Sequence, residues 1–239
     1  DCGGVCQPCP DGQGCSVGGE CTSGVCIGEI CQRARQSGIQ VLIDGAHAPG
    51  QLTLELDVLG ADFYTGNCHK WLLAPKGAAF LYARGEVQDL VEPLVVSWGW
   101  ESDDPGPNRF VDEQEWTGTR DPSAALAVPA ALDFLRRNDW SVVRERCRGL
   151  LLEARKRLLD LTGLPPLCPP EPWLAQMATL PLPDCDPSGL CRALRQRHRV
   201  EVPVFEFAGR PWLRISIQAY NTPGDVDALV AGLKTELSL

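Results

Sequence analysis

Two short polar motifs in the chain each follow a run that looks like a β-strand. Asp44 closes the apolar run 41–43, and Lys70 comes shortly after the run 60–64. Four of the 22 basic side chains are lysines, so a lysine at this place is uncommon for the sequence. Pyridoxal phosphate (PLP) requires an amine to form a Schiff base and a carboxylate to keep its pyridine nitrogen protonated. The two motifs therefore predict a PLP site.

Each residue of these motifs also has a simpler explanation. A loop lysine is usually a solvated surface residue, and a carboxylate after a strand, such as Asp44, is often a helix N-cap. His47 and His69 could be ordinary loop histidines, or they could bind a metal with Asp44 and Cys68. The chain has three histidines and no pair at helical spacing, which counts against a metal. Joint placement favours the cofactor site, because the carboxyl ends of parallel strands converge on one crevice.

The composition of the chain excludes several classes of partner. Its net charge of −9 would attract neither nucleic acid nor an anionic membrane surface. No apolar run approaches the roughly 18 residues that cross a bilayer, and no charged-then-apolar leader is visible. Because the chain begins at Asp1 without a methionine, we expect a start that is processed, trimmed or incomplete.

Cysteines are concentrated at the beginning of the chain. Seven of the twelve fall within residues 1–31, among glycines and few large apolar side chains. Such a segment cannot bury enough surface to fold unaided. It could be held by disulfides as in secreted domains, bind zinc starting from the CxxC at Cys6 and Cys9, or stay a reduced flexible tail. We therefore expect a Cys-rich irregular segment over residues 1–36.

After residue 36 the pattern becomes that of an α/β protein. Three short apolar runs are expected to form strands buried on both faces: 39–43, 61–64 and 78–82. The stretch 52–59 is compatible with a helix, which gives the strand–helix–strand order typical of a parallel sheet. These elements predict a partial PLP-binding large domain over 37–120.

The remaining residues, 121–239, predict a small α+β domain with a connecting helix. Asp121 and Pro122 are a helix start signal, and Pro129 predicts a kink. Residues 140–161 carry apolar side chains at steps of three and four, which predicts a long helix. The further elements are expected in the order strand 177–182, helix 187–198, strand 212–217 and helix 223–237, the last with Thr222 as its N-cap.

Four motifs stand in a fixed order along the chain: 44–50 (DGAHAPG), 65–77 (TGNCHKWLLAPKG), 116–122 (WTGTRDP) and 213–216 (LRIS). Together they resemble the isopenicillin N epimerase-like branch of the class V aminotransferase family, over roughly residues 38–239. The resemblance implies the C-terminal part of a PLP fold type I (aspartate aminotransferase-like) large domain, followed by an α+β small domain. The N-terminal part of the family's large domain has no counterpart in the sequence.

The resemblance also implies a role for each candidate cofactor-binding residue. Lys70 would be the catalytic residue, which forms the Schiff base with PLP and shuttles the α-proton of the substrate. Asp44 would pair with the pyridinium nitrogen, and His47 would contact the ring face or the phenolic oxygen. His69, and less directly Asn67, would reach the phosphate.

Two further residues take their roles from the same resemblance. Thr119 would contact the phosphate of the cofactor in a partner subunit, which makes a homodimer part of the mechanism. Arg214 would hold the carboxylate of an amino-acid substrate in a two-pronged hydrogen bond, and its alternative is a structural ion pair. No nucleic acid and no membrane span are expected.

The type of reaction stays open, since epimerisation, transamination and lyase chemistry share one carbanion. Desulfuration is disfavoured, because 198–210 contains no cysteine and Cys191 falls on an expected helix. The alternative to an enzyme is a catalytically inactive truncated or fused remnant, in which a Cys-rich module has a binding or structural role. A PLP enzyme would work in the cytoplasm, whereas the Cys-rich start would fit an extracytoplasmic location.

Overall fold

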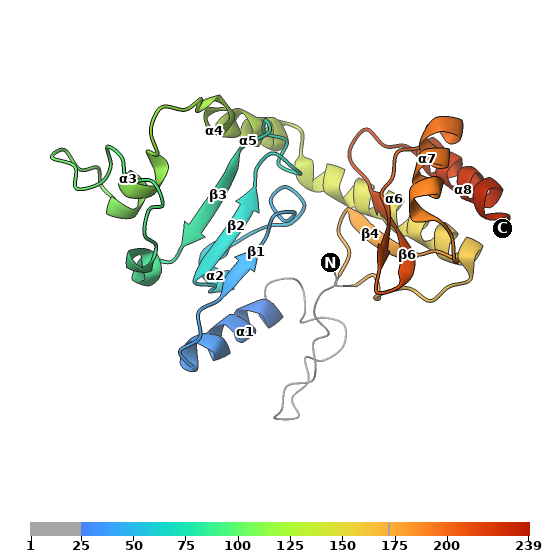
Figure 1. Ribbon diagram of the computed structural model, residues 1–239, viewed down its shortest axis with the longest axis horizontal. Helices are drawn as coiled ribbons and strands as arrows, with labels where there is room; N and C mark the ends of the chain where they lie inside the picture. The colour runs from blue at the N-terminus through green and yellow to red at the C-terminus, as the bar shows by residue number, and fades with distance from the viewer. Residues whose placement is uncertain (1–24, 172) are drawn as a thin grey trace. The chain divides into compact units, whose positions relative to one another are not determined.

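The chain forms two compact units, each with its own hydrophobic core (Figure 1). The computed structural model describes residues 25–171 and 173–239. One unit ends at Arg136 and the other begins at Arg137. The alternatives for the cysteines in residues 1–24 lie outside the described residues. The domain boundaries expected at residues 36 and 120 stay predictions.

A three-stranded sheet, in the order β1-β2-β3, organises the first unit. It consists of β1 (Leu42–Asp44), β2 (Phe63–Asn67) and β3 (Ala79–Ala83). β1 and β2 are parallel, as the strand–helix–strand order predicted, and the helix between them, α2 (Leu56–Leu59), is shorter than predicted. β3 runs antiparallel to β2, and the residues that join them, 68–78, form turns and no crossover helix of the kind that usually joins parallel strands.

The strands of this sheet are less buried than the sequence suggested. Leu42 on β1 is 61% exposed, and Ile39 just before it is 60% exposed. Burial on both faces was therefore a wrong prediction for β1 in the described chain. An apolar run specifies that a strand forms, but its burial depends on which neighbouring strands and helices cover it.

Helix α1 (Val25–Gln36) precedes the sheet, so the prediction of an irregular segment up to residue 36 is wrong for these residues. Arg33 and Arg35 lie in its last turn, where basic side chains interact favourably with the unpaired carbonyl groups. Cys31 is 1% exposed, and burial, together with the nearby charge of Asp62, raises the pKa of its thiol. This cysteine is therefore a core residue of the first unit.

A buried carboxylate connects the beginnings of β1 and β2 with the end of β3. The side chain of Asp62 accepts hydrogen bonds from Arg84 Nη2 at 2.6 Å and from the backbone N–H of Val41 at 2.9 Å. Burial alone would raise the pKa of Asp62. The hydrogen bonds, with the charges of Arg84 and Arg35, outweigh it and hold the pKa below its ordinary value. The carboxylate is thus kept ionised where it is 3% exposed.

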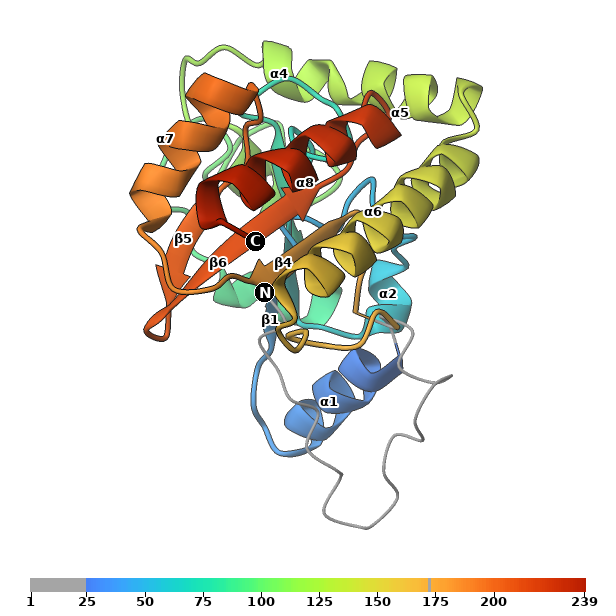
Figure 2. The same cartoon turned by 90° about the vertical axis from the view of Figure 1, so that its right-hand side faces the viewer.

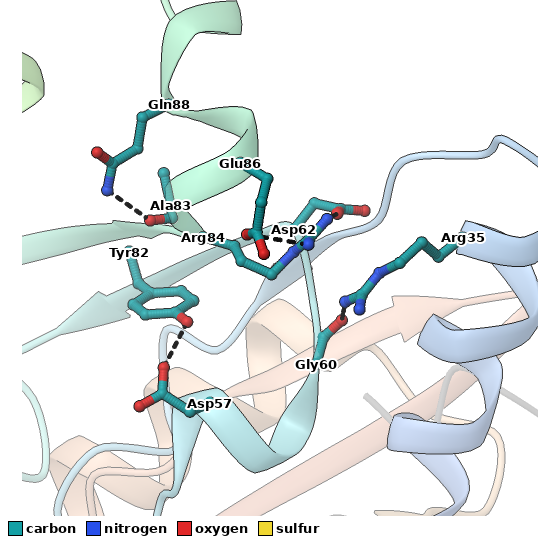
Figure 3. Close-up of polar contacts among 9 residues, drawn as sticks. All are labelled: Arg35, Asp57, Gly60, Asp62, Tyr82, Ala83, Arg84, Glu86 and Gln88. Atoms are coloured by element: carbon teal, nitrogen blue, oxygen red, sulfur yellow. Dashed lines mark hydrogen bonds and ion pairs between the residues drawn. The ribbon is translucent and has the colours of Figure 1, made fainter.

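Two neighbouring contacts extend this polar cluster to the flanking helices (Figure 3). Arg35 of α1 donates to the carbonyl oxygen of Gly60, and the hydroxyl of Tyr82 on β3 donates to Asp57 of α2 at 2.7 Å. Figure 3 shows Arg84 and Glu86 beside Asp62. The carboxylate of Glu86 lies 3.0 Å from Arg84 Nη1. The cluster therefore joins α1, α2 and the sheet by side-chain contacts.

Short helices complete the first unit: the 3-10 helix η1 (Gly85–Leu90), α3 (Arg109–Glu115), α4 (Ser123–Leu126) and α5 (Val128–Arg137). Asp121 accepts a hydrogen bond from the backbone N–H of Ser123 at 2.9 Å, which confirms the predicted helix start. The break between α4 and α5 falls beside Pro129, where a kink was predicted. No helix in the described part of the chain is long and apolar enough to cross a membrane.

The second unit is an α+β structure around an antiparallel sheet of order β4-β6-β5. Alternate residues of β6, such as Leu213 and Ile215, are buried in a core with Leu151 and Leu158 of α6. Helix α8 packs beside both α6 and α7 (Figure 2). The elements are α6 (Trp140–Thr162), β4 (Met177–Pro181), α7 (Pro187–His198), β5 (Val204–Phe207), β6 (Arg210–Ser216) and α8 (Pro223–Leu237).

Helix prediction was accurate in this unit. The three helices begin and end within one residue of the predicted limits, and Thr222 forms a capping box with Asp225 at the start of α8. Strand β5 was not predicted, because its four residues are too few to show a clear period.

Replacing Asp62 with alanine should lower the free energy of unfolding by about 3 kcal/mol, since it leaves buried hydrogen-bond donors without their acceptor. Glu86→Ala is the matched control, because it removes the exposed partner of the same arginine and should change stability little. Urea unfolding of the full chain measures both.

The stability difference between wild type and Asp62→Ala should also depend on pH. The pKa of Asp62 is lowered in the folded state, so its contribution is present above the ordinary carboxyl pKa. That contribution is lost as the pH falls through the lowered pKa. The stability difference between wild type and Asp62→Ala should therefore narrow in acid, and a constant difference would contradict this assignment.

Candidate active site

Asp44 is the last residue of β1, and the loop that follows it turns back at once. Its side-chain oxygen accepts a hydrogen bond from the backbone N–H of Ala46 at 2.9 Å, a turn in which aspartate is favoured. The backbone N–H of Gly45 still bonds to Thr65 of β2 at 2.9 Å, which holds the start of the loop against the sheet. The carboxylate of Asp44 is exposed, at the carboxyl end of a parallel strand as predicted.

The lysine loop leaves β2 after Asn67 and is held by one carbonyl group. The backbone N–H groups of Cys68 and His69 both donate to the carbonyl oxygen of Ala78, at 3.0 and 3.1 Å. His69 Nδ1 lies 2.8 Å from the same oxygen. A carbonyl oxygen can only accept, so Nδ1 carries the proton in this contact. These bonds fix the backbone directly before Lys70.

The two loops meet because Gly50 has no side chain. Its φ angle is +89°, and a Cβ atom there would lie 2.2 Å from the carbonyl oxygen of Trp71. Any other residue would be strained and would collide with the backbone of the lysine loop. The glycine therefore permits the close approach that brings His47 to Lys70.

His47 connects the two loops through both nitrogens of its ring. Lys70 Nζ lies 3.2 Å from His47 Nε2, and the indole N–H of Trp71 donates to His47 Nδ1 at 3.2 Å. The backbone carbonyl of His47 accepts a hydrogen bond from Gln51 at 2.8 Å, which holds the turn that carries the imidazole. The structure thus brings together the lysine, the imidazole and the loop that begins with Asp44.

The other predicted site residues have different positions. Asn67 ends β2 beside this pair of loops. Thr119 is exposed in the loop before α4, after Gly118 with a φ angle of +104°. Arg214 lies in the second unit on the central strand β6, part-buried, and its Nε is buried without a hydrogen-bond partner among the described residues.

Sequence reasoning assigned no role to two residues at this site. Trp71 was part of the lysine motif, but an indole there could equally be a core side chain. The hydroxyl of Tyr64 is buried with no hydrogen-bond partner in the described chain, and a Cβ at Gly45 would lie 1.9 Å from it. Burial and the charge of Asp44 raise the pKa of Tyr64. The strand pattern gave the position of Tyr64 but no sign of an unpaired hydroxyl.

A metal site was the alternative for His47 and His69. Across 25–171 and 173–239, no three His, Cys, Asp or Glu side chains are grouped so that they could hold a metal ion. Both ring nitrogens of His47 contact other side chains, and one of those of His69 contacts a carbonyl group. The chemistry of the loops is that of an amine beside an imidazole, with an exposed carboxylate nearby. These groups fit the aldehyde and the pyridine nitrogen of PLP.

A family model described as aminotransferase class-V matches residues 20–229. The chain belongs to the class V aminotransferase family. The match begins before residue 38, where the resemblance was placed, and so takes in all of α1. This family and its fold are PLP-dependent, which agrees with the prediction of the cofactor class.

Curated relatives of the family include enzymes with different names. Isopenicillin N epimerase from Amycolatopsis lactamdurans is 41% identical over 221 residues, which cover 87% of this chain and 55% of that protein. A probable L-cysteine desulfhydrase, chloroplastic, from Arabidopsis thaliana is 36% identical over 228 residues, 85% of this chain and 46% of that protein. The chain thus spans about half the length of the curated relatives it matches.

Solved structures support the predicted fold class, PLP fold type I. The apo cysteine desulfurase from Thermococcus onnurineus NA1 has a TM-score of 0.73 at 20% identity, over 89% of this chain and 56% of that chain. Alanine–glyoxylate aminotransferase from Nostoc sp. has a TM-score of 0.65 at 21% identity, over 87% of this chain and 56% of that chain. At these identities the likeness shows the fold alone.

Gly50→Ala should lower the free energy of unfolding by about 3 kcal/mol, because it adds both backbone strain and a collision with the lysine loop. Gly38→Ala is the control: its φ angle is +70° but a Cβ there meets nothing within 4 Å. Gly38→Ala should lower the free energy of unfolding by about 1 kcal/mol, from backbone strain alone. Equal losses in urea unfolding would mean that the approach of the two loops does not depend on Gly50.

Proposed function

We propose that this chain carries the lysine-bearing part of a PLP-dependent enzyme that acts on an amino acid. The observation that carries the proposal is the 3.2 Å contact between Lys70 Nζ and His47, which joins the lysine loop to the loop that starts at Asp44. Bound PLP supplies an electron sink for the electrons of a bond broken at the substrate's α-carbon. Membership of a PLP-dependent family supports the same chemistry.

Three residues of the first unit would hold and assist the reacting part of the cofactor. Lys70 would attach the cofactor through its amine, and once the substrate displaces it would take and return the α-proton. Asp44 would accept the hydrogen bond of the pyridinium nitrogen, and its exposed carboxylate at a strand end can reach a ligand. His47 would contact the ring face or the phenolic oxygen, on the side where it meets Lys70.

The phosphate would be bound by polar residues around the lysine loop. His69 donates through Nδ1 to the Ala78 carbonyl, so its Nε2 can donate to a phosphate oxygen only after the imidazole takes up a second proton. Asn67 would contribute less directly, and Thr119 would act on the cofactor of a partner subunit, so the proposal includes a homodimer.

Arg214 would hold the carboxylate of the amino-acid substrate. Its alternative role, a structural ion pair, is not supported by the described residues, where Arg214 has no ion-pair partner and its buried Nε has no acceptor. A buried guanidinium nitrogen without an acceptor is costly, and a carboxylate would satisfy it with two parallel hydrogen bonds.

The proposed step is removal of the α-proton of an amino acid, which epimerisation, transamination and lyase chemistry share. Cys191 is held in α7, where its thiol donates to the carbonyl oxygen of Val202 at 3.4 Å, and this supports the expectation that it is not a desulfurase nucleophile. The names of the relatives, isopenicillin N epimerase and cysteine desulfhydrase, fall within the same set of reactions.

A non-catalytic protein is the second candidate function. The exposed apolar side chains of Ile39 and Leu42 favour it, since in this chain the outer part of the sheet is not covered by described residues. It predicts no specific reaction of Lys70 with PLP. A cytoplasmic location stays a prediction.

Purified full-length chain mixed with PLP should develop a visible absorption band that Lys70→Ala abolishes. Lys76→Ala is the matched control, because Lys76 is exposed in the same loop and should leave the band unchanged. If wild type and Lys70→Ala give the same spectrum, the enzymatic proposal is wrong and the non-catalytic candidate takes its place.

A further inference from the structure

The indole of Trp71 forms a hydrogen bond that determines which ring nitrogen of His47 carries the proton. Its side chain is 8% exposed, and its indole N–H donates to His47 Nδ1 at 3.2 Å. An indole N–H can donate but never accept. Nδ1 of His47 must therefore be the acceptor in this contact and carry no proton.

The tautomer of His47 follows from that bond. A neutral imidazole has one proton, and if Nδ1 lacks it then Nε2 carries it. Nε2 is the atom that lies 3.2 Å from Lys70 Nζ. In this tautomer the N–H of a neutral His47 therefore points toward Lys70.

We propose that Trp71 is a positioning residue that sets the tautomer of His47, so that Nε2–H points toward the amine of Lys70. In the loaded protein this N–H would donate to the phenolic oxygen of PLP, an extension that rests on the proposed function. A defined tautomer favours the contact of His47 with the phenolic oxygen over the contact with the ring face, because a ring that stacks on the cofactor face needs no defined tautomer. Gln51 donates to the backbone carbonyl of His47 and so holds the turn that carries the ring.

His69 provides an internal reference for the opposite tautomer. Its Nδ1 lies 2.8 Å from the carbonyl oxygen of Ala78, which can only accept, so neutral His69 carries its proton on Nδ1. The chain holds three histidines, so the ring signals of the full-length protein can be assigned one by one with single substitutions. The two loop histidines should therefore give opposite patterns in one sample.

Long-range ¹H–¹⁵N correlation spectra of the full chain, labelled at histidine and without PLP, test the proposal. Wild type should show His47 protonated on Nε2 and His69 on Nδ1. Trp71→Phe keeps an aromatic ring but removes the donor, and should give His47 a mixture of tautomers while His69 is unchanged. Trp212→Phe, which removes the indole bond to Phe207 in the second unit, should change neither signal.

Two outcomes would overturn the proposal: a wild-type His47 with a proton on Nδ1, or the same His47 pattern in wild type and Trp71→Phe. PLP titration gives a separate readout, in which Trp71→Phe should weaken binding about 3- to 10-fold, the worth of one hydrogen bond. Failure of wild type to bind PLP would reject the proposed function, while the spectra would still decide the tautomer.

Discussion

The parallel pairing of β1 with β2 is the interaction on which the candidate site depends. Asp44 lies opposite Thr65, so the loops that follow both strands begin at one edge of the sheet. At the other ends of these strands, the backbone N–H of Asp62 donates to the carbonyl oxygen of Val41, and the backbone N–H of Val41 donates to the Asp62 carboxylate. A buried carboxylate therefore fixes the register at one edge, and reactive side chains meet at the opposite edge.

Close approach of the two loops is the second constraint, and it rests on backbone geometry. Gly50 lets one loop lie against the carbonyl group of Trp71, and Ala78 holds the other loop with its carbonyl oxygen. Neither contact involves a reacting group. Together they place His47 between Lys70 and Trp71, so that one imidazole links the lysine to the loop of Asp44. The candidate site residues are thus positioned by residues to which no chemical role is assigned.

The features that could be predicted from the sequence are those determined by interactions between residues close together in the chain. Helices α6, α7 and α8 were found because apolar period, caps and prolines act within a few residues, and the placement of Asp44 and Lys70 after two strands followed from short motifs. The exposure of β1 was missed, because it depends on which other elements of the chain cover it. The antiparallel direction of β3 was missed, because an apolar run does not specify the direction of the strand it forms. The hydrogen bond between Trp71 and His47 was also missed, because no periodicity in the sequence indicates it. Helix α1 was missed because its cysteines resembled those of a disulfide-rich segment.

The central claim is that Lys70, of the four lysines in the chain, is the one built to bond PLP. Aldehydes also react weakly with surface amines, so the site of attachment is more informative than attachment itself. Borohydride reduction of the full chain with stoichiometric PLP, followed by peptide mass spectrometry, locates the trapped group. One pyridoxyl group is expected, on the peptide that contains Lys70. Label spread over Lys76, Lys156 and Lys234, or no label at all, would contradict it.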